Sequence, residues 1–324
     1  MSAEARIALF GVGGVGRAFL ELIEERATPV VMVCAADSRG AVLGELSAAD
    51  VAGWKAAGSP DRVVGSTPGE LIARAKPDVV VDLTSCDFET AEPSLAILRA
   101  GLDAGLPVVT ANKSPLARHG AELRARAGGW HRIGCAAAAG AALPAAAVAR
   151  ALARTDRIDS IEGVLTGTTT FVLDEMRRGV SVHDATKAAQ EAGIAEPDPS
   201  IDLGGWDTAA KLVVLASIVW EELDLDLDLD GVAVSGIEAA DPSADGLQQL
   251  VGRAQRRGDE VTARVEPEVL DPRHPLSALR GRDKGVVFRG PAIGEVVVTG
   301  GRSHPGGTAA AALGDVLRLT EVVS

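Results

Sequence analysis

A glycine-rich turn near the start of this chain of 324 residues limits its possible folds more than any other feature. The sequence GVGGVG at 11–16 follows the apolar run 7–10 and opens a stretch, 17–25, with helical periodicity. In such a turn the first glycine permits a tight bend, the second lets a pyrophosphate approach the backbone, and the third allows close helix–strand contact. The free N–H groups of the helix N-terminus favour a phosphate. The pattern predicts a strand–turn–helix unit that binds a dinucleotide through Gly11, Gly13, Val15 and Gly16.

The first 130 residues alternate between strand and helix signals. The continuous apolar run over 30–36 is typical of a buried parallel strand. The segment 78–83 repeats this pattern, 107–110 is predicted as another strand, and 93–104 has the pattern of a helix. Strands that alternate with helices imply right-handed crossovers and a parallel sheet. This part of the chain is therefore expected to form a doubly wound α/β domain, in which ligands bind at the carboxyl ends of the strands.

The pattern changes after an Ala- and Gly-rich stretch, 134–153. The alternation of aspartate and leucine over 224–230 predicts a half-buried strand with an acidic edge. The other elements expected here are strands over 161–166, 260–269 and 285–299, and helices over 171–178, 182–193, 207–220 and 308–319.

Composition excludes several classes of protein. A formal charge of −13 opposes binding to a phosphate backbone, and five phenylalanines with four tryptophans are too few to stack bases along a single strand. The absence of tyrosine excludes any reaction that needs a phenol as proton donor. The cysteines, Cys34, Cys86 and Cys135, lack CxxC spacing and predict buried thiols in a reducing compartment. With no signal-peptide pattern and no unbroken apolar run of ~18 residues, we expect a cytoplasmic protein with no nucleic-acid and no membrane partner.

Two further positions bear on the cofactor. Asp37 ends the second predicted strand, where a carboxylate can accept a hydrogen bond from the ribose 2′-OH of NAD. Arg39 can instead meet the 2′-phosphate of NADP, so the sequence leaves the choice open. Thr84 and Ser85 follow the strand 78–83, where they either contact the cofactor or cap a helix before Glu89.

Lysine is scarce, with six lysines among 32 basic residues. Where arginine is the usual cation, a lysine can be present for its chemistry, because an ammonium can release a proton and a guanidinium effectively cannot. Lys113 lies in TANKSP at 110–115, directly after a predicted core strand. It is therefore a candidate for the ligand-binding edge of the sheet, the alternative being a surface lysine in a turn.

A second cluster of charges surrounds Lys211. The segment 196–211 places Glu196, Asp202 and Asp207 in a loop rich in proline and glycine that leads into an apolar helix. Asp207 and Lys211 are four residues apart, so they share a helix face and can pair. A helix start with such an ion pair is the simpler reading, but a loop held by prolines also suits a preorganised site.

These motifs make the chain resemble a homoserine dehydrogenase, an enzyme that interconverts L-homoserine and L-aspartate-4-semialdehyde with NAD or NADP in threonine and methionine biosynthesis. The resemblance runs nearly end to end, through GVGGVG, VVTANKSPLA, GVLTGTTTFVLDEM, AGIAEPDPSIDLGGWDTAAK, VEPEVLDPRHPLS and TAAAALGDVLRL. Its most specific part is the AEPDP segment with the aspartates and the lysine that follow. No regulatory extension follows Ser324, so the chain resembles the short, monofunctional form.

The resemblance implies a Rossmann-type dinucleotide-binding domain over 1–133, to which 303–324 returns. A second α/β domain over 134–302 would bind the small-molecule substrate and form a homodimer. Within the site, Glu196 would hold the substrate amino group and Asp207 its polar end. Lys211 would donate a proton to the developing alkoxide, and Lys113 would lie between nicotinamide and substrate. We also expect Asp202 and Thr168 to contact the substrate.

The resemblance further implies a monovalent cation, Na or K, bound by the backbone at Ala136, Ala139, Ala141 and Leu143. Some positions depart from the family's habit. Ala136 stands where a glutamate is common, Ile194 where a tyrosine often stands, and Thr166 where an asparagine is usual. Two alternatives follow: a related dehydrogenase of another small amino-acid semialdehyde or aldehyde, and a dinucleotide-binding protein without catalysis.

Overall fold

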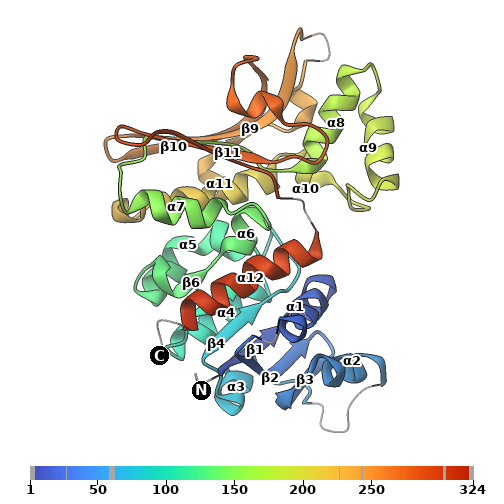
Figure 1. Ribbon diagram of the computed structural model, residues 1–324, viewed down its shortest axis with the longest axis vertical. Helices are drawn as coiled ribbons and strands as arrows, with labels where there is room; N and C mark the ends of the chain where they lie inside the picture. Colours follow the sequence, from blue (N-terminus) through green and yellow to red (C-terminus); the bar gives the residue numbers. More distant parts are fainter. Residues whose placement is uncertain are drawn as a thin grey trace. The chain divides into compact units, whose positions relative to one another are not determined.

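The chain folds into two compact units, which are considered one at a time. The computed structural model describes residues 4–26, 28–57, 63–225, 227–241, 244–301 and 304–320. The first unit comprises Met1–Ala141 and His304–Ser324, and the second comprises Ala142–Ser303. Each unit is built on a sheet of six strands, which confirms the predicted α/β class with a doubly wound domain and a second α/β domain (Figure 1).

The sheet of the first unit has the strand order β3-β2-β1-β4-β5-β6. Its strands pair in parallel, except that β3 runs antiparallel to β2. The direction of the connections reverses between β1 and β4, which is the switch point where ligands bind in such sheets. The strands are β1 (Ala5–Phe10), β2 (Val30–Asp37), β3 (Gly40–Leu46), β4 (Val79–Asp82), β5 (Val108–Thr110) and β6 (Ile133–Gly134).

Helices cover this sheet and bury its apolar strands. Because Val79, Val80 and Val81 of β4 are fully buried, both faces of the strand are covered, as its unbroken apolar run predicts. The helix α12 packs against α1, so residues from both ends of the described chain contribute to the same hydrophobic core. The helices are α1 (Gly14–Glu25), α2 (Ala48–Ala57), α3 (Pro68–Ala75), α4 (Ser94–Asp103), α5 (Ser114–Ala127), α6 (Ala136–Gly140) and α12 (Pro305–Thr320).

The sheet of the second unit has the order β12-β11-β7-β9-β10-β8 and is mainly antiparallel. Its strands are β7 (Ser160–Val164), β8 (Val232–Val234), β9 (Leu247–Arg257), β10 (Glu260–Leu270), β11 (Gly285–Gly290) and β12 (Gly294–Thr299). Its helices are α7 (Ala145–Ala153), α8 (Gly167–Arg177), α9 (Val182–Glu191), α10 (Ser200–Leu203) and α11 (Trp206–Val219). The apolar α11 is buried along nearly its whole length and packs on β9, where a Cβ at Gly252 would lie 3.0 Å from the Thr208 side chain. A glycine at 252 therefore lets the helix approach the sheet closely.

The predicted strand over 224–230 is wrong. Glu221–Leu223 and Leu229–Gly231 form short 3-10 helices, and residue 226 lies outside the described part. Asp224 has a left-handed backbone, with φ of 52°, and the Asp228 carboxylate accepts hydrogen bonds from the N–H groups of Asp230 and Gly231. These aspartates therefore bend the chain, because their short side chains compete with strand pairing for backbone donors.

Other elements differ from expectation in extent. The strand β9 has no counterpart among the predicted elements, and 285–299 forms two strands that turn at Gly294, whose φ is 65°. The helix α8 begins at Gly167, earlier than the expected residue 171, because the threonines that precede Phe171 are helical and buried. β-branched residues lower helix propensity only slightly, so burial prevails here.

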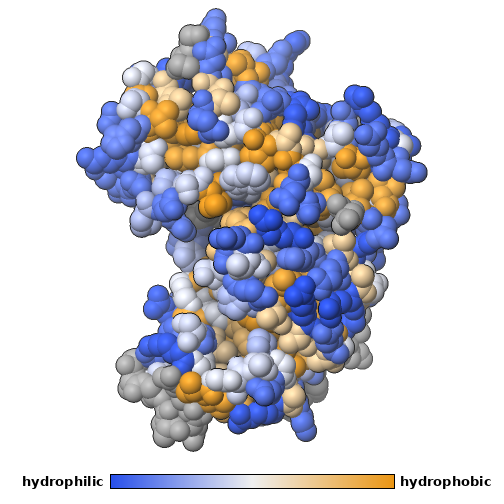
Figure 2. Space-filling model, turned by 180° about the vertical axis from the view of Figure 1, so that it is seen from behind, coloured by the Kyte–Doolittle hydropathy of each residue, from blue (hydrophilic) through white to orange (hydrophobic). Residues whose placement is uncertain are grey.

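No helix in the described part of the chain is long and apolar enough to span a membrane. Figure 2 shows the hydrophobic side chains of the visible face as patches that hydrophilic side chains interrupt. Among the described residues, the large apolar side chains that are exposed are Val64, Val182, Ile201, Trp206, Val269 and Val297.

Candidate active site

The glycine-rich turn has the geometry that a dinucleotide requires. Gly11 has a φ of +95°, and a Cβ there would lie 2.4 Å from the carbonyl carbon of Leu83 at the end of β4. A Cβ at Gly16 would lie 2.2 Å from the Gly11 oxygen. By contrast, a Cβ at Gly13 would meet no atom within 4 Å, and no side chain caps α1 at this position. The turn is therefore closed on its strand side, while the start of the helix opens to space that a phosphate can fill.

A cavity of about 540 Å³ lies beside this turn, within the size range of cofactor sites. The predicted cofactor residues Gly11, Gly13, Asp37, Thr84 and Ser85 line it. Val15, Gly16, Arg39 and Lys113 are not among the lining residues. The cavity lies at the carboxyl ends of β1, β2 and β4, where dinucleotides bind in sheets of this kind. The position of the cavity and the glycine-rich turn therefore both fit a dinucleotide.

Asp37 forms an ion pair that the sequence did not reveal. Lys55 of α2 places its ammonium 2.5 Å from the Asp37 carboxylate, and the Arg39 backbone N–H donates to the same group at 2.8 Å. Burial alone would raise the pKa of Asp37, but the hydrogen bonds and charges of Lys55 and Arg39 outweigh it and lower the pKa. Asp37 is therefore a fixed anion at the cavity, with a cation on each side.

Thr84 and Ser85 do not cap a helix, because α4 begins only at Ser94. The Thr84 hydroxyl donates to Asp82 at 2.6 Å, and the Ser85 carbonyl accepts a hydrogen bond from the Asn112 amide at 2.9 Å. The helix-cap alternative is therefore wrong. Both residues belong to the loop that follows β4 and lines the cavity.

Lys113 lies on the turn between β5 and α5 and is half-buried. Its ammonium is 3.7 Å from the Cys86 sulfur and 5.8 Å from the centre of the Phe88 ring. These contacts come from the loop that follows β4, so Lys113 is held against the carboxyl edge of the sheet. Lys113 is therefore not a freely solvated lysine on the surface.

Lys211 and Asp207 form a buried pair in the second unit. Their side chains are 11% and 8% exposed, and the Lys211 ammonium donates both to the Asp207 carboxylate and, at 2.9 Å, to the Leu165 carbonyl. The Asp207 carboxylate also accepts a hydrogen bond from the Thr166 hydroxyl at 2.7 Å. Thr166 thus belongs to the cluster, although the sequence marked it only as a departure from the family. The sequence signal that could have marked it is the threonine-rich segment TGTTT at 166–170, whose threonines are all buried in the structure.

Thr168, two positions after Thr166 in the chain, forms a hydrogen bond with Asp202. The Thr168 hydroxyl donates to the Asp202 carboxylate at 2.6 Å and lies 3.4 Å from the Ile194 carbonyl. This second contact reaches the loop that carries Glu196, whose side chain is exposed. The Gln190 amide donates to the Pro197 carbonyl at 2.9 Å and so fixes the same loop.

Of the backbone positions predicted to bind a cation, Ala136 and Ala139 lie in α6, and Ala141 and Leu143 follow it. Ala141 has a strained backbone with φ of 53° and ψ of −120°, and the Leu143 carbonyl accepts a hydrogen bond from the Ala145 N–H at 2.7 Å. The Ala136 N–H donates to Asp315 at 2.8 Å. Within the described residues no group of three acidic, histidine or cysteine side chains could hold a metal ion.

Family models match most of the chain. One described as "Homoserine dehydrogenase" matches residues 144–317, and one described as "Homoserine dehydrogenase, NAD binding domain" matches residues 11–133. Among curated relatives, the "NAD(+)-dependent homoserine dehydrogenase" of Pseudomonas canavaninivorans is 30% identical over 98% of this chain and 96% of its own. The homoserine dehydrogenase of Sulfurisphaera tokodaii is 30% identical over 90% and 94% of the two chains.

Solved structures agree in fold. A hyperthermophilic archaeal homoserine dehydrogenase in complex with NADPH superposes with a TM-score of 0.84 at 26% identity, over 98% of both chains. The homoserine dehydrogenase of Thermoplasma acidophilum gives a TM-score of 0.83 at 26% identity, over 98% and 99% of the two chains. The similarity thus extends over both units.

Proposed function

The chain belongs to the homoserine dehydrogenase family, whose members are NAD(P)-dependent oxidoreductases acting on a CH–OH group, and from this premise we propose that it interconverts L-homoserine and L-aspartate-4-semialdehyde. The observation that carries the proposal is the buried Lys211–Asp207 pair, because a buried ammonium held by a carboxylate and a carbonyl is a preorganised partner for an oxyanion. The pathway that we assign to the reaction is threonine and methionine biosynthesis.

The first unit holds the cofactor. Gly11, Gly13 and the start of α1 would receive the pyrophosphate, and Asp37 with Lys55 would meet the adenosine ribose. When bound, NAD or NADP supplies or accepts the hydride. The cations around Asp37 are compatible with a 2′-phosphate, while the carboxylate is compatible with a free 2′-OH, so we propose that both cofactors are used.

Lys211 moves the proton at the substrate oxygen. Among the described residues its ammonium donates to Asp207 and to the Leu165 carbonyl, and an ammonium has a third N–H. We assign that N–H to the substrate oxygen, where it stabilises negative charge and then protonates it in the reducing direction. Asp207 orients the ammonium, and the Thr166 hydroxyl holds Asp207 in turn.

The remaining residues bind the ends of the substrate. The exposed carboxylate of Glu196 would pair with the substrate ammonium, a charge-assisted contact. Asp202 and Thr168, joined by their own hydrogen bond, would present polar atoms to the same molecule. Lys113 follows β5 at the ligand-binding edge of its sheet, and we assign it to the substrate-facing end of the cofactor.

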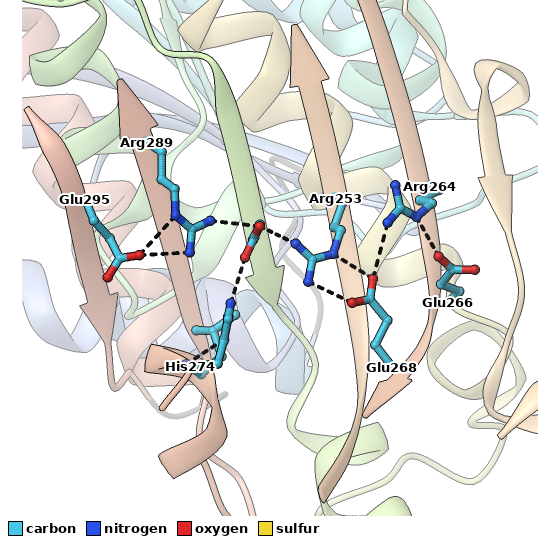
Figure 3. A network of polar contacts seen from close by, with 9 residues as sticks. Arg253, Arg264, Glu266, Glu268, His274, Arg289 and Glu295 are labelled. Atoms are coloured by element: carbon cyan, nitrogen blue, oxygen red, sulfur yellow. Dashed lines mark hydrogen bonds and ion pairs between the residues drawn. The ribbon is translucent and has the colours of Figure 1, made fainter. Parts of the chain in front are cut away.

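We further propose a homodimer formed through the sheet of the second unit. The strand register aligns Val297, Val287, Glu162, Arg253 and Arg264 on the face opposite to α11. Figure 3 shows that the charged side chains of this face pair with one another, for example Arg289 with Glu295 and Arg253 with Glu268. Charges that are already paired are easier to bury against a partner than isolated ones.

A monovalent cation at the backbone of Ala136, Ala139, Ala141 and Leu143 stays a prediction. With alanine at position 136 the donor set would be made of carbonyl groups, which suit Na or K as oxygen ligands. Initial rates in potassium, sodium and a large organic cation test it. Equal rates with all three cations would show that the reaction does not depend on a bound monovalent cation.

The function is tested by initial rates of NADH and NADPH formation with L-homoserine, L-serine, L-threonine and simple short-chain alcohols. We expect kcat/KM for L-homoserine to exceed that for the other alcohols by at least about 100-fold, because unpaired polar groups in a built site reject analogues strongly. A higher value for another amino alcohol would favour the related dehydrogenase suggested by Ile194 and Thr166. Cofactor binding without turnover of any alcohol would contradict both.

A further inference from the structure

Asp82 is a carboxylate at the end of β4 with no role in the reaction described above. It is fully buried, and its partners are hydroxyl and backbone N–H groups. One oxygen accepts hydrogen bonds from the Thr84 hydroxyl at 2.6 Å and from the Thr84 N–H at 3.0 Å. The other accepts from the Thr110 hydroxyl at 2.7 Å and from the Ser94 hydroxyl. Asp82 thus joins the ends of β4 and β5 to the start of α4.

The carboxylate determines which way these hydroxyls point. The carboxyl oxygens of Asp82 accept hydrogen bonds from the Thr84, Ser94 and Thr110 hydroxyls, so the lone pairs of these hydroxyl oxygens are left for other donors. The Thr110 oxygen accordingly accepts from the Asn112 N–H at 2.9 Å, and the Thr84 oxygen lies 3.4 Å from the Asn112 amide nitrogen. Burial raises the pKa of Asp82 above its ordinary value, and the hydrogen bonds that this carboxyl group accepts oppose that effect only in part.

The same chain of hydrogen bonds continues to both neighbours of Lys113. The Asn112 amide nitrogen donates to the Ser85 carbonyl at 2.9 Å, and the Asn112 oxygen accepts from the Ser114 hydroxyl at 2.6 Å and from its N–H at 3.1 Å. Asn112 and Ser114 are both fully buried. Lys113 is therefore held on each side by residues whose orientation traces back to one carboxylate.

We propose that Asp82 is a positioning residue, which fixes the turn of Lys113 against the Thr84–Ser85 loop through Thr110 and Asn112. Its role in turnover rests on the proposed function, since that function assigns Lys113 to the site. Its role in placing Lys113 does not, because the ammonium of Lys113 lies 3.7 Å from the Cys86 sulfur and can be followed there without any substrate. The two roles can therefore be tested apart.

The first pair of variants compares the two ends of one strand. Asp82→Asn keeps the size of the side chain but replaces one accepting oxygen by an NH2 group, which cannot accept the hydrogen bonds that hydroxyl and N–H donors make to that oxygen. Asp78→Asn is the matched control, because Asp78 directly precedes β4 and its carboxylate accepts a part-buried hydrogen bond from the Arg6 N–H at 2.8 Å. We expect kcat for L-homoserine to fall between about 10- and 100-fold in Asp82→Asn, more than cofactor affinity falls, since small misplacements of reacting groups have effects of this size. The control should retain wild-type kcat.

The second pair covers the case in which Asp82→Asn does not fold. Thr110→Val removes the hydroxyl that links Asp82 to Asn112, whereas Thr110→Ser retains it. We expect Thr110→Val to lose kcat as Asp82→Asn does, and Thr110→Ser to restore it. Equal activity of the valine and serine variants would overturn the proposal.

The readout without substrate is the rate at which iodoacetamide alkylates Cys86 at fixed pH. Cys34 and Cys135 are buried, while Cys86 is only partly buried, so one thiol per folded chain should react. Because the Lys113 ammonium lies 3.7 Å from the Cys86 sulfur, Lys113→Ala should change the rate at which this thiol is alkylated. We expect Asp82→Asn and Thr110→Val to change this rate in the same direction as Lys113→Ala does, and Asp78→Asn to leave it unchanged. An unchanged rate in both test variants refutes the placement of Lys113 by Asp82, and this holds even if the wild type fails to oxidise L-homoserine.

Discussion

Replacing Lys211 tests two consequences of one buried ion pair. In Lys211→Met the Asp207 carboxylate, 8% exposed, keeps the Thr166 hydroxyl but loses its cation. Removing one partner of a buried pair destabilises a protein by about 3–5 kcal/mol. In a domain of this size each kcal/mol lowers Tm by about 2–4 °C, so Tm should fall by about 6–20 °C.

The effect on catalysis should be larger than the effect on stability explains. A positioned acid contributes a factor of about 10²–10⁴, so kcat should fall by that factor while the variant is still folded at the assay temperature. The double variant Lys211→Met with Asp207→Leu separates the two effects. It removes both charges, so Tm should recover, yet activity should stay as low as in the single variant.

Lys187→Met is the matched control for this pair. Lys187 also pairs with an acidic residue four positions later, Glu191, but both side chains are about two-thirds exposed and 4.0 Å apart. An exposed pair of this kind is worth about 0–1 kcal/mol, so Tm and kcat should stay close to wild type. The reasoning is refuted if Lys211→Met keeps wild-type kcat, or if the double variant regains activity together with stability.

Three further predictions concern the cofactor, the pH range and the oligomer. Lys55→Met should weaken NADP binding about 10-fold or more and NAD binding far less, because the Asp37 carboxylate is then left facing the 2′-phosphate without its cation. Fluorescence titrations with NADPH and NADH measure both affinities. Equal losses of affinity for the two cofactors would show that Lys55 does not meet that phosphate. Burial alone would raise the pKa of Glu162, but Arg289, Arg253 and His274 lower it below its ordinary 4.5. The ionised Glu162 therefore stabilises the fold fully above about pH 4.5, and this stabilisation is lost as pH falls through the lowered pKa. On acidification, Tm should drop more steeply in wild type than in Glu162→Gln. Parallel curves of Tm against pH for the two proteins would contradict this. Val297→Asp should convert the dimer to a monomer in size-exclusion chromatography with light scattering, and a wild-type monomer would refute the dimer itself.

Much of the first unit could be predicted because its signals are local. The glycines at 11–16 bend the chain, and the three valines at 79–81 are typical of a strand covered on both faces. The partners of Asp37 and Asp82 could not be predicted in this way. Lys55 lies 18 positions beyond Asp37, and Ser94 and Thr110 lie 12 and 28 beyond Asp82, so these contacts exist only once the sheet and its helices have formed.

The second unit shows the limits of periodicity. The pattern DLDLDLD has the period of a strand, yet the aspartates capture backbone N–H groups and turn the chain instead. In β9 the polar residues of GRAQRR conceal the strand, because Arg253 finds its partners on neighbouring strands. The spacing of Asp207 and Lys211, by contrast, predicted a pair that the helix α11 provides. Contacts between residues four apart in a helix can be predicted from their spacing, whereas contacts across a sheet depend on the register of strands that are distant in the sequence.

The most direct test of the function is the reducing direction. Purified protein is mixed with L-aspartate-4-semialdehyde and NADPH, loss of the reduced cofactor is followed, and the amino-acid product is identified by chromatography against L-homoserine. We predict that L-homoserine forms mole for mole with the cofactor consumed, and that Lys211→Met abolishes both changes together. Consumption of NADPH without L-homoserine, or no consumption by wild-type protein that binds the cofactor, would contradict the assignment of this substrate to the Lys211 site.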